Sequence, residues 1–313
     1  MRPAAAASLV ALVVLHVIAA FAAFVAPYEP SRQHREYPWT PPTPLRIDGL
    51  RLIVSSSGDS AGSYPIHFLH RDRSGVHLFG VDEPGRIFLL GTDGLGRDQF
   101  SRLVYGARVS LFSGLTAALF SAFAGASLGA AAGFYGGRTD RLVMRLAELF
   151  LALPWMYLLL AARAFFPLSA DPRAVFLALL ALLGLVGWAR PARLVRGIVL
   201  TTKERDFVLA ARGFGASDLY LIRRHILPET YPTLATYLSL AIPQYVLAEA
   251  TLSFLGLGFS GAVPSWGSLL AALTQFEVLD QYWWITVPAF VFAGVFACYN
   301  VVARNLKSAT PAQ

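Results

Sequence analysis

Three histidines in the first third of the chain have a type and spacing that could hold a metal. His67, His70 and His77 form the pattern H-x-x-H-x6-H, and histidine is the commonest metal ligand in proteins. A single strand, however, would send residues 67 and 70 to opposite faces, and no cysteine or cluster of carboxylates accompanies them. We therefore expect no metal site here.

A second candidate for chemistry is an acidic side chain inside an apolar run. Glu249 follows Gln244 within the run 231–256. An ionisable group at membrane depth often lies on a solute or ion pathway. The sequence therefore predicts Gln244 and Glu249 as candidate pathway residues, and a polar contact between helices is the alternative interpretation of Glu249.

The sequence lacks the motifs that would let the chain supply its own energy. It contains no G-x-x-x-x-G-K-[ST] phosphate loop, and GTDGLG at 91–96 lacks the lysine of such a loop. No H-E-x-x-H zinc motif occurs either. We expect no catalytic residue, no cofactor and no enzymatic activity in this chain; a membrane-anchored enzyme, the alternative, would need a catalytic set within 28–107.

The elements that must position these residues are membrane helices. The chain is 56% hydrophobic and 14% charged, whereas soluble proteins carry about 25% charged residues. Apolar runs of about 20 residues are long enough to cross about 30 Å of hydrocarbon as helices. The predicted spans are 8–27, 108–135, 146–166, 173–190, 231–256 and 283–303. This composition predicts an all-α polytopic membrane protein with six transmembrane helices.

The basic residues predict the orientation of these helices. Arginines and lysines gather in the loops around 138–145 and 190–224, whereas 257–282 contains none. Cytoplasmic loops are the basic ones, so both termini are expected in the cytoplasm of a multi-pass protein of the cell (inner) membrane. The apolar part of 1–27 exceeds the usual core of a signal peptide, which favours a retained helix over cleavage.

Between the first two spans the sequence predicts an extracytoplasmic insert, residues 28–107. LRIDGLRLIVSS alternates apolar and polar residues, and YPIHFLH, GVHLFG and RIFLLG are short runs bounded by turn residues; all are typical of strands. After them, 98–107 is expected to form an interfacial helix with an Asp98–Arg102 pair. The organisation is thus a helix (1–27), the insert, a five-helix core (108–303) and a cytoplasmic tail (304–313).

Glycines recur every fourth residue in the second span. Gly125, Gly129 and Gly133 would lie on one helix face, where they let another helix approach closely. The spacing predicts packing inside a bundle or at a subunit interface, with packing inside the chain alone as the equally open alternative.

The longest inner loop, 191–230, predicts two short helices joined at a hinge. Glycine favours a break at Gly215, Ser217 can cap the second helix, and Pro228 begins the approach to the fifth span. The loop also has an apolar face at a cytoplasmic surface, formed by Leu209, Phe214, Leu219, Tyr220 and Ile222. Such a face fits a groove on a partner protein or the surface of the bilayer.

The segment LAARGFGASDLYLIRRHILP resembles the cytoplasmic loop of ABC-importer permeases, in which Glu-Ala-Ala is followed by Gly and then by Ile-x-Leu-Pro. Leu209 stands in place of the family's Glu, and His225 in place of its Ile. The matching positions are Ala210, Ala211, Gly215, Leu227 and Pro228. The resemblance implies that this loop docks on an ATPase, with Ser217 and Leu219 between the matched positions.

Further motifs are similar to the dipeptide, oligopeptide and nickel permeases of that family, over about 90–304. They are LGTDGLGRDQFSRLVYGARVSL, LALPWMYLLL, WARPARLVRG, RRHILPE and EATLSFLGLGFSGAVPSWGSLL. The C-terminal VARNLKSATPAQ differs from the family's acidic ending.

The resemblance implies a permease subunit that forms half of the translocation pathway of an importer for peptides, nickel or related solutes. The implied partners are a second permease, two cytoplasmic ATPases that bind ATP and Mg, and an extracytoplasmic substrate-binding protein. An ion-driven carrier that uses Glu249 is the rival interpretation. Inverted-repeat halves with broken helices would favour it, but we find no such repeat in the sequence.

Overall fold

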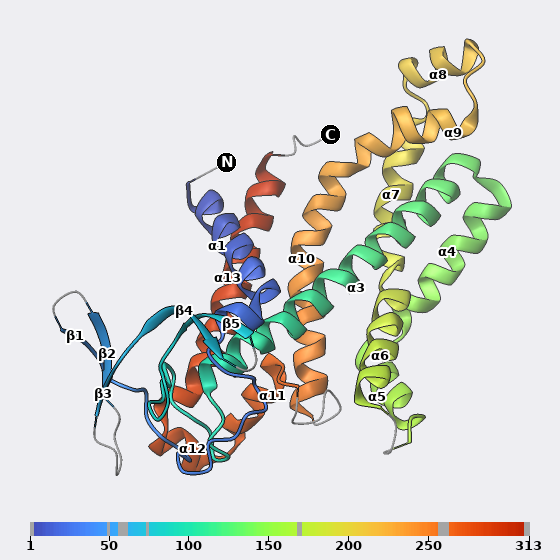
Figure 1. The fold of residues 1–313 in the computed structure, drawn as a ribbon. Helices are drawn as coiled ribbons and strands as arrows, with labels where there is room; N and C mark the ends of the chain where they lie inside the picture. The colour runs from blue at the N-terminus through green and yellow to red at the C-terminus, as the bar shows by residue number, and fades with distance from the viewer. Residues whose placement is uncertain are drawn as a thin grey trace. The chain divides into compact units, whose positions relative to one another are not determined.

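The computed structural model describes residues 3–48, 51–55, 62–72, 75–167, 171–255 and 263–309, which are mostly helical (Figure 1). Contacts along the chain divide it into two compact units. Unit 1 comprises Met1–Leu9, Ser113–Ala248 and Ala297–Gln313, and unit 2 comprises Val10–Phe112 and Glu249–Phe296.

Four helical stretches are long and apolar enough to cross a membrane among the described residues: Pro3–Ala20, Gln99–Tyr135, Leu177–Thr202 and Trp283–Lys307. They correspond to α1 (Pro3–Ala20), α3 (Gln99–Tyr135), α6 with α7 (Pro172–Gly187 and Ala189–Thr202) and α13 (Val287–Ala309). A fifth arises if α4 (Gly137–Ala152) and α5 (Trp155–Ala164), bent by 80°, form one span.

The fifth predicted span falls in α10 (Leu227–Phe254). This helix has 28 residues and is therefore long enough, but it contains Pro232 and Pro243 and is not among the apolar helices above. The count of six spans thus stays a prediction.

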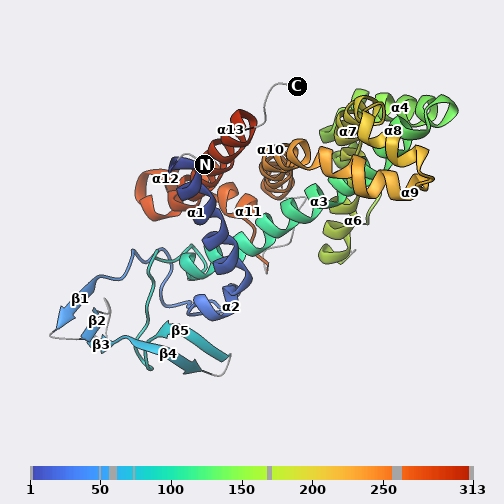
Figure 2. The same cartoon turned by 90° about the horizontal axis from the view of Figure 1, so that it is seen from above.

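The predicted insert contains β-structure. Strands β1 (Leu45–Asp48), β2 (Arg51–Ser55) and β3 (Ser63–Pro65) form an antiparallel sheet in that order. Strands β4 (His67–Asp72) and β5 (Gly75–Gly80) form a separate two-stranded ribbon, which Figure 2 shows clearly.

The prediction of a further strand at RIFLLG, 86–91, is wrong, because this segment gives its backbone hydrogen bonds to side chains. The Ile87 N–H donates to the Tyr28 hydroxyl over 3.0 Å, and the Phe88 N–H donates to Thr43 Oγ1 over 2.8 Å. Ile87 and Phe88 are buried with Val54 and Tyr28 in an apolar cluster. The apolar run is therefore a core-filling loop.

The separate interfacial helix predicted at 98–107 is also wrong, because α3 is continuous from Gln99 to Tyr135. Leu103, Val104 and Ala107 are buried, so this end of α3 packs inside unit 2. No proline occurs between residues 98 and 135, so the amphipathic segment and the apolar span can form one continuous helix.

The expected Asp98–Arg102 pair does not form. Asp98 instead caps α3, since its Oδ2 accepts from the N–H and the hydroxyl of Ser101 over 2.8 and 2.6 Å. Burial raises the pKa of Asp98 to about 7. Arg102 Nε lies 3.7 Å from Asp93 Oδ2.

Short elements complete the described chain. They are α2 (Ala22–Val25), α8 (Asp206–Gly213), α9 (Asp218–Leu221), a π-helix (Ile222–Ile226), α11 (Trp266–Ala271), a 3₁₀ turn (Ala272–Thr274), α12 (Phe276–Gln281) and a second 3₁₀ turn (Trp283–Thr286).

Candidate functional site

The glycine face of α3 packs against α7 within unit 1. A Cβ at Gly125 would lie 2.6 Å from the carbonyl oxygen of Trp188, and one at Gly129 would lie 2.4 Å from that of Ala192. At Gly133 it would lie 2.8 Å from Val199 Cβ. Contacts this close leave room only for hydrogen, so the three glycines let the two helix backbones touch.

A break between α4 and α5 shapes the next part of unit 1. Pro154 follows Leu153, whose ψ of 127° is extended, as expected for a residue before proline. The chain therefore turns by 80° between two helices. Irregular backbone of this kind occurs at membrane depth where it lines a cavity or is buried in protein.

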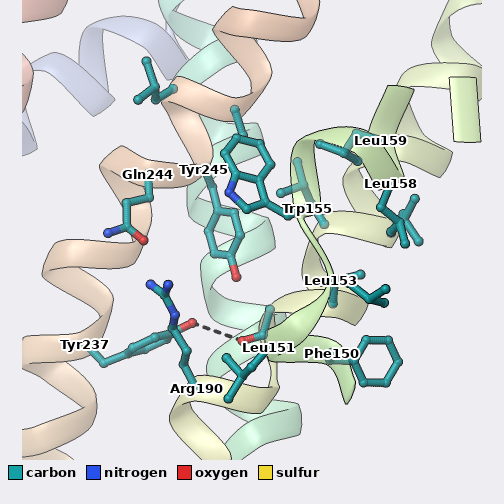
Figure 3. A pocket seen from close by; sticks show the side chains of 16 residues that line it. Phe150, Leu151, Leu153, Trp155, Leu158, Leu159, Arg190, Tyr237, Gln244 and Tyr245 are labelled. Carbon is teal, nitrogen blue, oxygen red and sulfur yellow. Dashed lines mark hydrogen bonds between the residues drawn. The ribbon is translucent and has the colours of Figure 1, made fainter. Parts of the chain in front are cut away.

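A cavity of about 330 Å³ lies beside this break (Figure 3). Its walls come from the α4–α5 break, α6, the start of α7 and α10. The lining residues are Phe150, Leu151, Leu153, Trp155, Leu158, Leu159, Leu182, Leu183, Val186, Gly187, Arg190, Tyr237, Gln244, Tyr245, Leu247 and Ala248. The cavity is thus largely apolar, with one charged group and a few polar ones, as ligand pockets usually are.

The polar groups of this cavity lie together along α7 and α10 (Figure 3). The Tyr237 hydroxyl lies 2.8 Å from Ser121 Oγ and 3.5 Å from the Gly187 carbonyl oxygen, to which it donates. Arg190 has an exposed side chain and supplies the positive charge. An anionic group on an otherwise apolar ligand would fit beside Arg190.

A second groove of about 630 Å³ shares Leu151, Arg190, Tyr237 and Gln244 with the cavity. It adds Arg193, Leu194, Leu240 and Ala241. The two hollows therefore form one surface along α10, here called the α10 pocket. Gln244, a predicted pathway residue, lines both parts.

Glu249, the other predicted pathway residue, lies elsewhere. It is 2% exposed; its Oε2 accepts from Ser110 Oγ over 2.5 Å and its Oε1 accepts from Ser253 Oγ over 2.7 Å. Ser110 Oγ in turn accepts from the Trp266 N–H over 3.1 Å. In unit 2 the carboxylate thus links α3, α10 and the start of α11, which is the polar helix contact considered as its alternative role.

Removal of this carboxylate is expected to destabilise unit 2. Glu249→Ala leaves buried hydroxyls of Ser110 and Ser253 without their acceptor, which costs about 1–3 kcal/mol for each unsatisfied group. Thermal unfolding of the purified chain in detergent should show a clearly lowered midpoint. Gln244→Ala, on the same helix at an exposed position, is the control and should unfold close to wild type. A Glu249→Ala protein as stable as wild type would contradict the structural role.

Within unit 1, the predicted inner loop forms a hairpin of α8 and α9 that lies between the end of α7 and the start of α10 (Figure 1). Val208, Leu221 and Ile226 are fully buried, in a cluster with Val195 and Val199 of α7. The Arg212 guanidinium also lies over the Phe134 ring, 5.3 Å from its centroid. The hairpin is therefore packed onto the helices beneath it.

The hairpin turns where glycine was predicted. Gly215 has a φ of +87°, a conformation that costs other residues more than glycine. The Ser217 side chain accepts from the Tyr220 N–H over 3.4 Å and caps α9. The second helix differs from the predicted 218–226 helix, because after α9 it continues as a π-helix into α10 without a break at Pro228. Pro228 directly follows the π turn, at the end of which the Leu227 N–H donates to the Ile222 carbonyl oxygen.

The outer surface of the hairpin is apolar and exposed. Phe214 is 93% and Leu219 63% exposed, and Phe207, Leu209 and Tyr220 are also exposed. Phe207 was missed in the sequence because it precedes the recognised motif, although its apolar type was a signal. Exposed apolar and aromatic side chains on a hairpin that is packed at its base can insert into a groove of a partner protein.

The predicted docking residues separate into two groups. Ala210, Gly215, Ser217 and Leu219 are exposed. Ala211 and Leu227 pack against the buried cluster of the hairpin, as does Ile222 of the apolar face, and Pro228 is half-buried. Ala211, Leu227 and Ile222 thus support the hairpin from inside, so a large residue at 211 would disturb the hairpin itself.

The histidines of unit 2 do not follow the alternation expected of one strand. Leu69 has a φ of +55°, and this kink lets His67 Nε2 and His70 Nδ1 both approach Asp82, at 3.3 and 3.7 Å. The expectation that they point to opposite faces is therefore wrong. His77 bonds instead to the Ala26 carbonyl oxygen and to Asp72. Within the described ranges, no group of three or more His, Cys, Asp or Glu side chains could hold a metal ion.

The sequence contains a G-x-S-x-G pattern, GDSAG, at 58–62. In hydrolases this motif needs a strand before the serine and a helix after it. Residues 56–61, including Ser60, lie outside the described residues, and the next element is the strand β3. Among the described residues, the motif is followed by strand β3 and not by the helix that a catalytic serine requires.

Comparison with known proteins adds to this geometry. Residues 125–310 match the family described as the binding-protein-dependent transport system inner membrane component. The chain is 38% identical over 220 residues to the dipeptide transport system permease protein DppC of Bacillus subtilis, which covers 70% of this chain and 67% of that protein.

Two further relatives carry similar names. The oligopeptide transport system permease protein OppC of Bacillus subtilis is 35% identical over 248 residues, or 77% of each chain. A putative peptide transport system permease protein of Brucella suis is 41% identical over 223 residues, or 71% of each chain. The matched family segment, 125–310, contains both the hairpin and the residues of the α10 pocket.

Proposed function

Because this chain belongs to the family of binding-protein-dependent transport system inner membrane components, we propose that it is the permease subunit of an ATP-driven peptide importer. In this proposal it is a mostly helical protein of six spans in the cell membrane, with both termini in the cytoplasm and the β-containing insert outside. The peptide cargo is supported by the names of the relatives, which are dipeptide and oligopeptide permeases.

The α8–α9 hairpin is the observation that carries the proposal. The outer side of the hairpin is apolar and exposed, and its inner side is packed against the helices beneath it. The outer side can therefore insert into a groove of a partner protein, and the packed inner side would transmit a movement of that partner to the permease. The partners proposed for it are two cytoplasmic ATPase subunits, which bind ATP and Mg and perform the hydrolysis, so that the chain itself is not an enzyme. The permease would have two conformations, which open the pathway to opposite sides of the membrane. Closure of the ATPases would shift the equilibrium toward one of them.

The α10 pocket is the proposed contribution of this chain to the pathway. A second, homologous permease would supply the other half, and an extracytoplasmic substrate-binding protein would deliver the solute. An apolar wall with Arg190 fits a peptide, which combines apolar side chains with a terminal carboxylate.

Uptake of a radiolabelled dipeptide into cells that hold the whole transporter tests this function. Because ATP is the proposed energy source, depletion of ATP should stop uptake even while the ion gradients are maintained. A protonophore or sodium ionophore, applied with ATP held constant, should leave most of the uptake. Uptake that survives ATP depletion and collapses with an ion gradient would instead establish the ion-driven carrier.

A further inference from the structure

A pocket of about 420 Å³ between α4 and α7 gathers four guanidinium groups. The two helices pack together in unit 1, and they lie beside each other in Figures 1 and 2. The lining residues are Asp140, Arg141, Met144, Arg145, Glu148, Arg193 and Arg196. Four arginines and two carboxylates leave this pocket with a net positive charge.

The carboxylates are already engaged. Arg196 Nη2 donates to Asp140 Oδ2 over 2.6 Å, which ties α7 to α4. Arg145 Nη1 lies 3.6 Å from Glu148 Oε2. Among the residues that the structure describes, Arg141 and Arg193 form no ion pair with a carboxylate. The excess positive charge is therefore held by one arginine on each helix.

An apolar surface adjoins this charge. Val143 and Ala147 of α4 are buried against residues 188–192. Leu142, Leu146 and Leu149, on another face of the same helix, are 64%, 42% and 59% exposed. The helix thus presents guanidinium groups beside exposed leucines, a combination that matches a molecule with an anionic head and an apolar tail.

We propose that this pocket binds the phosphate headgroup of an anionic phospholipid, with the acyl chains against the exposed leucines of α4. The inference rests on the proposed function in one respect: the proposed topology places the part of α4 and α7 that lines this pocket at the cytoplasmic surface of the membrane. Basic pockets between helices on that side bind anionic lipid headgroups. Guanidinium groups also bind phosphate oxygens in a bidentate manner.

Such a lipid would join two helices. A phosphate held by Arg141 and Arg193 links α4 to α7, next to the Asp140–Arg196 pair that already joins them. The chain continues from α7 into the α8–α9 hairpin. Bound anionic lipid is therefore expected to stabilise the helix on which the hairpin is built.

Lipid titration of the purified full chain, followed by native mass spectrometry, tests the site. The probes are phosphatidylglycerol and phosphatidylcholine with identical acyl chains. The Arg141→Gln/Arg193→Gln variant should bind phosphatidylglycerol roughly thirtyfold more weakly than wild type, for the loss of two arginines at a membrane surface. Arg138→Gln/Arg223→Gln loses the same charge outside the pocket and should bind phosphatidylglycerol with at most a few-fold change.

Three results would overturn the proposal. Equal binding of phosphatidylglycerol and phosphatidylcholine by the wild-type chain would show that the headgroup charge is not recognised. Equal loss of phosphatidylglycerol affinity in the two double variants would show that only the net charge of the chain matters. Displacement of phosphatidylglycerol by inorganic phosphate at equal concentration would identify a site for a soluble anion. The titration needs no ATPase partner, so a failure here leaves the ATP-dependent uptake test of the proposed function unaffected.

Discussion

Phe214→Asp is expected to abolish both ATPase binding and ATP-driven uptake. Phe214 is 93% exposed at the tip of the hairpin, so the substitution costs the isolated chain little. In a complex the ring would be buried in a groove, and aromatic anchors of this kind commonly contribute 2 kcal/mol or more. A charged side chain in their place adds the cost of desolvation. Together these effects predict a loss of affinity of roughly a hundredfold or more.

Co-purification of the ATPase subunits with the tagged chain measures this effect directly. Phe276→Asp is the matched control, since Phe276 of α12 is 80% exposed and lies in the segment proposed to be extracytoplasmic. The control should retain the ATPases at wild-type amounts. If the Phe214→Asp chain, inserted in the membrane at normal levels, retains them too, the hairpin is not the docking site.

Gly129→Val is expected to prevent unit 1 from reaching its folded state. The new Cβ would lie 2.4 Å from the carbonyl oxygen of Ala192 and 3.0 Å from its Cα. These are backbone atoms of a helix, so relief requires α3 and α7 to move apart. Overpacking in a core costs about 1–3 kcal/mol and occasionally more, and here the loss extends along the shared face at Gly125 and Gly133.

The yield of monodisperse protein and its thermal unfolding in detergent measure this loss. Gly294→Val provides the comparison, because Gly294 lies within helix α13 and a Cβ there meets nothing within 4 Å. Both substitutions place the same β-branched residue in a helix. A Gly129→Val protein with the yield and melting temperature of the Gly294→Val protein would show that the contact of α3 with α7 tolerates a side chain.

Features set by local sequence were predictable. The left-handed residue between two short helices needs glycine, which identified Gly215, and the hydroxyl before Asp218 identified the cap at Ser217. Alternation and turn residues located most strands of the insert. In each case the residues that determine the conformation are neighbours in the sequence.

Features set by distant contacts were not predictable. The apolar run around Phe88 looks like a strand, yet its hydrogen bonds go to Thr43 and Tyr28, far away in the sequence. The hydrogen bond of Glu249 with Ser110, 139 residues away in the sequence, was likewise not apparent beforehand. The α10 pocket combines residues from several helices, and only Gln244 among them was singled out beforehand.

The π-helix at Ile222–Ile226 determines how the following part of α10, up to Ala248 in unit 1, is rotated about its axis. A π turn is equivalent to one residue added to an α-helix, and one residue corresponds to about 100° of rotation about the axis. The backbone is helical from α9 through this turn into α10, so the extra residue determines which side of α10 carries Tyr237 and Gln244. Were the turn to relax to regular α-helix, the pocket side chains would rotate away from Arg190. The winding of this one turn next to the hairpin therefore determines the orientation of the pocket wall that α10 forms.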